Sequence, residues 1–384
     1  MSFDQIILLA IPLFLLLMLA EWGYGCYKGR NTYGLGDTLS SLGQGLLSQV
    51  FGVFTQIFQI GLYTALFPHL NLFGGATAAV WHSPWGWVLA VILYDFCDYW
   101  LHRVSHERAV FWAAHVVHHQ SQHFNFSTAL RQESAYFVLG WIFYLPLAVI
   151  GVPPEQYAVA GVVVLVYQFW IHTEHIGKLG WLDRWFSTPS NHRVHHATNA
   201  RFIDRNYGAI LVVWDRLFGT FQEEDEPCVY GTLAPLNSWN PLDSLLQVYR
   251  VLLAKLRHAS GVRQAIAVLF KSPAWAPPGF LVRQMQAESK VQKPQLYKPE
   301  VGSLQRCLAV FLFLLLALEA LQILWQDELL LASQRALGAM LVLLGLCCVG
   351  RLMSRREGTV LVLFVLSAGL TATALCQLCC LPLP

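Results

Sequence analysis

Histidine is concentrated in three short segments of this chain. Eight of its 14 histidines fall in HRVSH (102–106), HVVHH (115–119) and HRVHH (192–196). On a helix, side chains three and four positions apart share a face, so each segment can direct two or three imidazoles toward one point. Neutral imidazole is a common protein ligand for zinc, copper, iron and nickel. Together the three segments predict a polynuclear metal site.

A ninth candidate ligand, His172, stands apart at the end of an apolar segment. Nine imidazoles exceed the need of one tetrahedral or octahedral ion, so two metal ions are expected. The all-histidine set differs from soluble di-iron bundles, which use Glu and Glu-x-x-His pairs, and from hydrolytic zinc sites with three protein ligands. His175 could be a tenth ligand or an interfacial neighbour, and we favour the neighbour. The predicted metal ligands are His102, His106, His115, His118, His119, His172, His192, His195 and His196.

The composition indicates a protein that lies mostly in lipid. Hydrophobic residues make up 55% of the chain, and its mean hydropathy is +0.47. Apolar runs of near-spanning length recur, so we predict an all-α polytopic membrane protein with about eight spanning or re-entrant helices. The expected spans are 5–21, 46–68, 85–101, 135–152, 155–171, 307–325, 328–350 and 358–380.

The distribution of Lys and Arg predicts the orientation. Of the 25 basic residues, all but Arg335 fall in segments 22–45, 102–134, 172–306 and 351–357. Placing these segments in the cytosol satisfies the positive-inside rule. The histidine segments would then form a cytosolic helical cap on a multi-pass protein of a bacterial inner membrane or the endoplasmic reticulum. Because orientation accounts for the basic residues and the net charge is only +2, no nucleic-acid binding is expected.

We expect three parts along the chain. Residues 1–230 would form the membrane-embedded catalytic domain, 231–306 a cytosolic polar and amphipathic connector, and 307–384 the C-terminal transmembrane helices. Asp98 lies one turn before His102 in an apolar segment, where carboxylates are usually functional. It is a candidate catalytic residue that could accept the second ring proton of His102. A helix-packing role, bonded to a neighbouring hydroxyl, is equally open.

Longer stretches around these histidines resemble the membrane-bound fatty acid hydroxylase and sterol desaturase superfamily. The resemblance rests on YWLHRVSHE (99–107), AAHVVHHQSQHFNFSTALRQ (113–132), QFWIHTEHIGKLG (168–180) and STPSNHRVHHATNARFIDRNYGAILVVWDRLFGTF (187–221). It implies two iron ions bound by the nine histidines, and a functionally required acid at Glu107. Glu133, which departs from the family pattern, could alter the pocket. Candidate pocket residues by this likeness are Asn125, Ser127, Thr128, Arg131 and Gln132.

Within the superfamily, the chain is similar to members that cleave alkylglycerol ethers. This implies a dioxygen-dependent hydroxylation of a membrane lipid at the ether-bearing carbon, giving a fatty aldehyde and glycerol or its derivative, with tetrahydrobiopterin as reductant. The sequence shows no fused haem, flavin or iron–sulfur module, so a separate electron donor is expected.

Two alternatives remain open. One is a hydroxylase or desaturase of sterols, carotenoids or fatty acyl chains that uses a protein electron donor. The other is a metal-binding transporter or sensor. A transporter would place its ligands near the bilayer midplane, whereas these histidines lie at the ends of helices, so an enzyme is favoured.

Overall fold

The computed structural model describes residues 3–133, 135–280, 295–326, 329–354 and 369. Every secondary-structure element in these residues is a helix, which confirms the predicted all-α class. The only β-type pairings among the same residues are two isolated bridges. The α-helices are α1 (Phe3–Tyr27), α2 (Leu35–Gln56), α3 (Leu62–Leu70), α4 (Ala78–Trp81), α5 (Pro84–Glu107), α6 (Ala109–His119), α7 (Phe126–Ala129), α8 (Tyr136–Gly140), α9 (Leu145–Val149), α10 (Pro154–Trp170), α11 (Pro189–His196), α12 (Val213–Phe218), α13 (Pro241–Leu256), α14 (Val262–Phe270), α16 (Ser303–Trp325) and α17 (Ala332–Leu352).

Three helices are long and apolar enough to cross a membrane, judged by length and composition: α1, α16 and α17. A fourth span is formed if α5 is joined to the helical segment Gly74–Trp81, from which it is bent by 104°. These elements coincide with the expected spans at 5–21, 85–101, 307–325 and 328–350. The apolar helices support an integral membrane protein, but the described residues do not contain eight spans.

The other expected spans differ from the structure for local reasons. Residues 135–152 form short helical pieces, α8, Trp141–Tyr144 and α9, with Gly140 and Pro146 at or beside the breaks. The run at 46–68 is divided between α2 and α3 by a π-helical turn, Ile57–Gly61. The segment at 155–171 forms α10, whose 17 residues are slightly short for a span. The segment at 358–380 lies outside the described residues.

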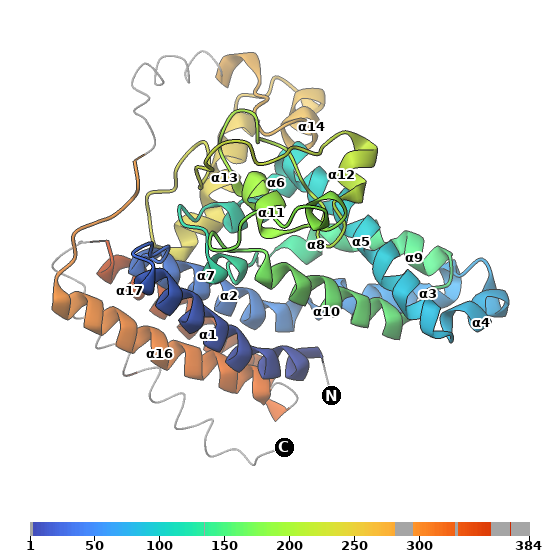
Figure 1. The fold of residues 1–384 in the computed structure, drawn as a ribbon, viewed down its shortest axis with the longest axis horizontal. Helices are drawn as coiled ribbons and strands as arrows, with labels where there is room; N and C mark the ends of the chain where they lie inside the picture. The colour runs from blue at the N-terminus through green and yellow to red at the C-terminus, as the bar shows by residue number, and fades with distance from the viewer. Residues whose placement is uncertain (1–2, 134, 281–294, 327–328, 355–368, 370–384) are drawn as a thin grey trace.

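The long apolar helices pack against one another at one side of the molecule (Figure 1). Helix α16 lies along α17, and both contact α2. Small residues permit the close approach: a Cβ on Gly345 would lie 2.4 Å from the side chain of Leu316. Such small-residue contacts are typical of helix pairs in membranes, where burial of apolar surface gives little driving force.

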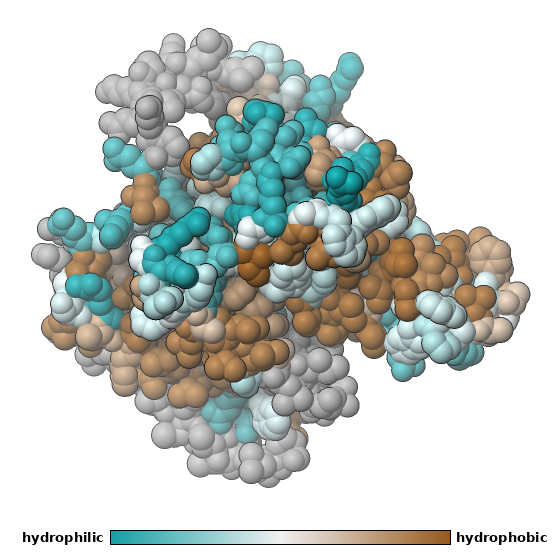
Figure 2. All heavy atoms as spheres, viewed as in Figure 1, coloured by the Kyte–Doolittle hydropathy of each residue, from teal (hydrophilic) through white to brown (hydrophobic). Residues whose placement is uncertain are grey.

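The visible surface is divided in the same way. Figure 2 shows hydrophobic atoms over the long helices and hydrophilic atoms over the region of α11 and the loops around it. On α1, Leu16 and Leu19 are each 63% exposed, although they are large apolar side chains. Exposed leucines on a helix of this length are stable in contact with lipid, so this face of α1 suits the bilayer.

The helices that carry the histidines form a cap beside the long helices (Figure 1). Helix α5 begins with Ser83, whose hydroxyl accepts a hydrogen bond from the Gly86 amide, and ends at the extended residue Arg108. Helix α6 follows immediately and packs against both α5 and α13. Helix α11 begins at Thr188, whose hydroxyl accepts from the Asn191 amide, with Pro189 in its first turn. These start signals fix where each histidine segment becomes helical.

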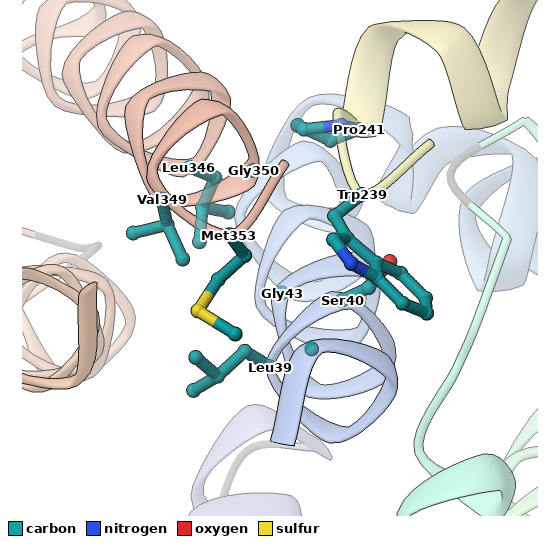
Figure 3. Close-up of a pocket in the computed structure, with 10 residues that line it drawn as sticks. Leu39, Ser40, Gly43, Trp239, Pro241, Leu346, Val349, Gly350 and Met353 are labelled. Atoms are coloured by element: carbon teal, nitrogen blue, oxygen red, sulfur yellow. The ribbon is translucent and has the colours of Figure 1, made fainter. Parts of the chain in front are cut away.

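A small apolar pocket lies where α2, α17 and the segment before α13 meet (Figure 3). Trp239 and Met353 form two of its walls, and Ser40 lies on its α2 side. The Ser40 hydroxyl accepts a hydrogen bond from the Arg131 guanidinium. Ser40 thus connects the pocket to Arg131, but no histidine lines the pocket.

Candidate metal centre

The first two histidine segments come together because α6 packs against α5. His102 and His106 lie one turn apart on α5, and His115 and His119 lie one turn apart on α6. The ring centroids are 4.8 Å apart for His102 and His115 and 4.7 Å apart for His106 and His119. The expected sharing of one helical face is therefore observed in both helices.

The third segment completes a first group of ligands. His195 of α11 lies 4.4 Å from His102 and 4.8 Å from His119, measured between ring centroids. One ring nitrogen from each member lies within 4.8 Å of one ring nitrogen from every other member, and all five side chains are buried. We call this set the five-histidine group: His102, His106, His115, His119 and His195.

The remaining four predicted ligands form a second group of the same kind. His172 Nε2 lies 3.3 Å from His118 Nε2 and 3.0 Å from His192 Nε2, and His196 Nε2 lies 3.1 Å from His192 Nε2. All four rings are buried. We call this set the four-histidine group: His118, His172, His192 and His196. The isolated His172 thus joins residues from two other helices.

Backbone carbonyls determine the tautomers of several of these rings. His118 Nδ1 donates to the Arg131 carbonyl at 3.0 Å, and His172 Nδ1 donates to the Gln168 carbonyl at 2.7 Å. A carbonyl can only accept, so in each neutral ring the proton is on Nδ1 and Nε2 carries a lone pair. Two such lone pairs face each other 3.3 Å apart. A cation between them converts this repulsion into attraction.

The geometry fits bound metal ions. Metal–imidazole bonds of about 2.0–2.1 Å place adjacent ligand nitrogens roughly 2.8–3.4 Å apart at octahedral or tetrahedral angles. The Nε2 separations of the four-histidine group fall in this range. In the five-histidine group, the Nε2 atoms of His102, His106 and His195 are buried without a hydrogen-bond partner among the described residues. Burial lowers the pKa of His119 and His196 well below its ordinary value, which keeps both rings neutral and able to bind metal.

The loop after α11 supports the five-histidine group. His102 Nδ1 donates to the Tyr207 carbonyl at 2.8 Å, and His195 Nδ1 donates to the Arg205 carbonyl at 2.9 Å. Both rings thereby present Nε2 to the centre of the group. Such outer contacts orient ligand histidines and raise their basicity.

Two buried aspartates hold this loop in place. Asp215 accepts from the backbone amides of Tyr207 and Gly208, each at 2.8 Å. Asp95 of α5 accepts from the Ile210 amide at 2.7 Å and from the Trp214 indole at 2.8 Å. The supports of the metal centre are therefore tied to the same helix that provides His102.

Arg131, one of the candidate pocket residues, connects three helices behind His118. Its guanidinium donates to the Val117 carbonyl of α6, to Ser40 of α2 and to Ser244 of α13. The side chain is 2% exposed. Burial lowers its pKa to about 10, so the guanidinium remains charged at neutral pH. Asn125 is also structural, because its carbonyl oxygen caps α7 by accepting from the Ser127 amide.

Glu133 lies closer to the site than the sequence indicated. Its Oε1 is 2.5 Å from Nδ1 of His115, and its side chain is buried. Burial raises the pKa of this carboxyl to about 7, while the nearby His118 opposes the rise. The contact favours a proton on His115 Nδ1 and leaves Nε2 for the metal. In the sequence, the only signal for this contact is that Glu133 follows the histidine segment at 115–119.

Aromatic side chains close the site on other sides. Phe124 is fully buried and lies 5.4 Å from His172 and 5.2 Å from His196. Trp112 lies 5.1 Å from His106, and all these distances join ring centroids. The aromatic shell excludes water from both groups, which strengthens interactions between the ligands and a bound cation.

The two candidate catalytic acids do not contact the histidines in the ways considered. Asp98 accepts a hydrogen bond from the Tyr144 hydroxyl at 2.7 Å, whereas His102 donates to Tyr207. The predicted Asp98–His102 bond is therefore wrong, and the hydroxyl-bonded alternative is observed. Glu107 pairs with Arg103, with Oε1 and Nε 2.8 Å apart. Its side chain is 36% exposed at the end of α5.

The remaining histidines near the site lie outside both groups. The ring of His175 packs edge-on against Tyr24, 5.3 Å away, in line with the favoured interfacial role. His123 approaches α2 at Gly34, where a Cβ would come within 2.7 Å of Nε2. The nine residues of the two groups are the nine predicted ligands.

The central part of the chain also matches a known protein family. Residues 87–220 match the family model of the fatty acid hydroxylases, so this part of the chain is similar to a fatty acid hydroxylase domain. The domain contains all nine histidines of the two groups, together with Tyr207 and Asp215.

Three relatives extend the similarity beyond this domain. The chain is 40% identical over 272 residues to alkylglycerol monooxygenase of Homo sapiens, and 36% identical over 269 residues to that of Danio rerio; each alignment covers 70% of this chain and 59% of the relative. It is 36% identical over 302 residues to alkylglycerol monooxygenase of Xenopus tropicalis, covering 78% of this chain and 65% of the relative. The chain thus spans 59–65% of the length of these relatives. No solved structure matches the chain significantly.

Proposed function

We propose that this protein is a membrane di-iron monooxygenase that cleaves the ether bond of alkylglycerols. The observation that carries the proposal is the division of nine buried histidines into two groups, each compact enough to bind one ion. The choice of iron and of this lipid class follows from the fatty acid hydroxylase domain and from the similarity to alkylglycerol monooxygenases.

The nine histidines would bind the two irons, and bound iron would supply the activation of dioxygen. The carbonyls of Tyr207, Arg205, Arg131 and Gln168 hold four of the rings with Nε2 directed inward. Because these supports are backbone atoms, they keep the ligand positions fixed without adding charge. A neutral ligand set of this kind suits dioxygen chemistry better than hydrolysis.

The reaction would place one oxygen atom of dioxygen on the ether-bearing carbon of the alkyl chain. The resulting hemiacetal collapses to a fatty aldehyde and glycerol or its derivative, and the second oxygen atom leaves as water. Two electrons must come from a separate donor, for which tetrahydrobiopterin is proposed. Glu107 remains a candidate proton-handling group.

We also propose a topology for the protein in the membrane, beyond the three apolar helices described above. The protein would be multi-pass, with the cap and both histidine groups facing the cytosol, because nearly all basic residues fall in the segments on that side. The proposed division is a catalytic part at 1–230, a connector at 231–306 and C-terminal membrane helices at 307–384.

The test is fatty-aldehyde production by membranes that contain the protein, supplied with an alkylglycerol, dioxygen and tetrahydrobiopterin. His119→Ala membranes of equal protein content are the control. Aldehyde that requires both the pterin and His119 supports the proposal. Absence of aldehyde in membranes whose protein retains two irons would overturn the assigned substrate or reductant, and would favour a hydroxylase of another lipid with a protein electron donor.

A further inference from the structure

The ring of Tyr207 is buried beside the five-histidine group, and its hydroxyl has no hydrogen-bond partner among the described residues. The side chain is 0% exposed. Its ring centroid lies 5.3 Å from that of His106, 5.8 Å from that of His102 and 5.9 Å from that of His195. A buried hydroxyl without a partner is costly, so it usually has a partner that is an ion, a water or a ligand.

Other buried tyrosines of the chain have partners for their hydroxyls. Tyr63 donates to the Val152 carbonyl at 2.7 Å, Tyr144 donates to Asp98 at 2.7 Å, and Tyr99 is 3.0 Å from the Thr220 hydroxyl. Tyr207 differs because its ring packs on three histidines whose own inward Nε2 atoms also lack partners. The ring that carries the unpaired hydroxyl thus packs against the three rings whose nitrogens lack partners.

Hydrogen bonds to both its backbone N–H and its backbone carbonyl hold Tyr207 in place. Its amide donates to Asp215 and its carbonyl accepts from His102, both at 2.8 Å. The preceding Asn206 has a left-handed φ of 55°, and its side-chain nitrogen Nδ2 donates to the carbonyls of Asn191 and Gln222. Holding Asn206 in this conformation costs free energy, which the surrounding hydrogen bonds offset. The ring is therefore held in its place against the group.

We propose that the Tyr207 hydroxyl donates a hydrogen bond to a small oxygen- or nitrogen-containing ligand bound at the five-histidine group. A phenol is protonated at neutral pH and can serve as donor. This inference rests on the proposed function, because it requires a metal ion in that group. It makes Tyr207 a catalytic residue that recognises the bound ligand, in contrast to its carbonyl, which only orients His102.

The test uses azide as a probe of the ferric protein, purified at full length in lipid nanodiscs. Azide can accept a hydrogen bond at its distal nitrogen, and its binding is followed by absorbance. Tyr207→Phe removes only the hydroxyl, so we expect two irons per chain as in the wild type and an azide Kd about fivefold higher, which corresponds to about 1 kcal/mol. Tyr63→Phe, which removes a buried hydroxyl elsewhere, is the matched control and should leave the azide Kd unchanged.

A second variant covers the case in which Tyr207→Phe loses iron. Replacing Tyr207 with 3,5-difluorotyrosine keeps the ring and makes the hydroxyl a stronger donor, so azide should bind more tightly. An azide Kd within twofold of wild type in every Tyr207 variant that retains iron would overturn the inference. A wild-type protein that binds no metal would overturn the proposed function as well, so the two failures are distinguishable.

Discussion

His118 donates a hydrogen bond from Nδ1 to the carbonyl of Arg131, 3.0 Å away, while the guanidinium of the same arginine donates to the carbonyl of Val117. Arg131 therefore contacts α6 at the ligand itself and at the adjacent Val117. Its guanidinium also bonds to α2 and α13. One buried residue thus connects a candidate metal ligand to α2, α6 and α13.

Replacing Arg131 with methionine should destabilise the cap. The change leaves the Val117 carbonyl and the side chains around it without their donor, at a cost of about 2–4 kcal/mol. The thermal midpoint of the purified protein should fall, and iron should dissociate more readily. Arg201→Met is the matched control, because Arg201 is 61% exposed in a surface ion pair with Asp225. A similar effect of both variants would contradict the prediction.

Replacing His172 with alanine should empty one metal site and leave the other. His172 belongs to the four-histidine group and contacts no member of the five-histidine group directly through its Nε2. We expect iron per chain to fall from two toward one, measured by metal analysis of purified protein. His175→Ala should retain both irons because His175 lies outside the groups. Loss of iron in His175→Ala would identify a tenth ligand.

Replacing Glu133 with leucine should weaken metal binding through His115. The carboxylate lies 2.5 Å from His115 Nδ1, and loss of such an outer partner lowers metal affinity about 10–100-fold. Competition with a chelator measures the change. Glu133→Gln keeps an acceptor and should have a smaller effect. Glu223→Gln, at an exposed ion pair with Lys178, is the control. Unchanged affinity in Glu133→Leu would show that the contact does not tune the ligand.

Replacing Glu107 with glutamine tests its proposed role in proton transfer. Glutamine preserves a hydrogen bond to Arg103 but cannot carry a proton. We expect kcat for alkylglycerol cleavage to fall by about 10²-fold with iron content unchanged. Asp225→Asn, which removes the charge from another half-exposed ion pair, should retain normal kcat. Full turnover by Glu107→Gln would assign Glu107 a purely structural role.

Acidification should destabilise the metal-free protein. Burial lowers the pKa values of His119, His192 and His196 in the folded state, so the unfolded chain binds more protons below its ordinary histidine pKa of about 6.5. The free energy of unfolding is therefore fully present above that pH and is lost as the pH falls below it. Thermal midpoints of chelator-treated protein between pH 8 and 5.5 measure this. A midpoint that stays constant would contradict the prediction.

The predicted ligands could be identified from sequence because helical spacing is a local property. HRVSH fixes the relation of His102 to His106 wherever α5 lies. The supports could not be identified in this way, because Tyr207 meets His102 only when a loop 105 residues later folds back. The same is true of Arg131, whose partners lie on α2, α6 and α13. Such contacts depend on tertiary structure and have no periodic signal.

The number of spans was the less predictable part of the fold. Hydropathy measures how apolar a run is, but it does not show whether the backbone continues as one helix. Residues 135–152 are apolar throughout most of their length, yet the helix is interrupted near Gly140 and Pro146. The backbone follows a 3₁₀ helix over Trp141–Tyr144, and Pro146 lies in the first turn of α9, a position at which proline favours the start of a new helix. Residues 135–152 therefore form several short helical pieces and not the single spanning helix that hydropathy predicts.

Two short helices each contribute to both histidine groups. Helix α6 provides His115 and His119 to one group and His118 to the other, while α11 provides His195 to the first and His192 and His196 to the second. The relative position of the two ions would consequently be set by the angle of about 100° between successive side chains of a helix. The α6 and α11 backbones would therefore fix the spacing of the two ions. Changes in the lipid-facing helices could therefore alter which substrate is accepted while the spacing of the ion pair stays constant.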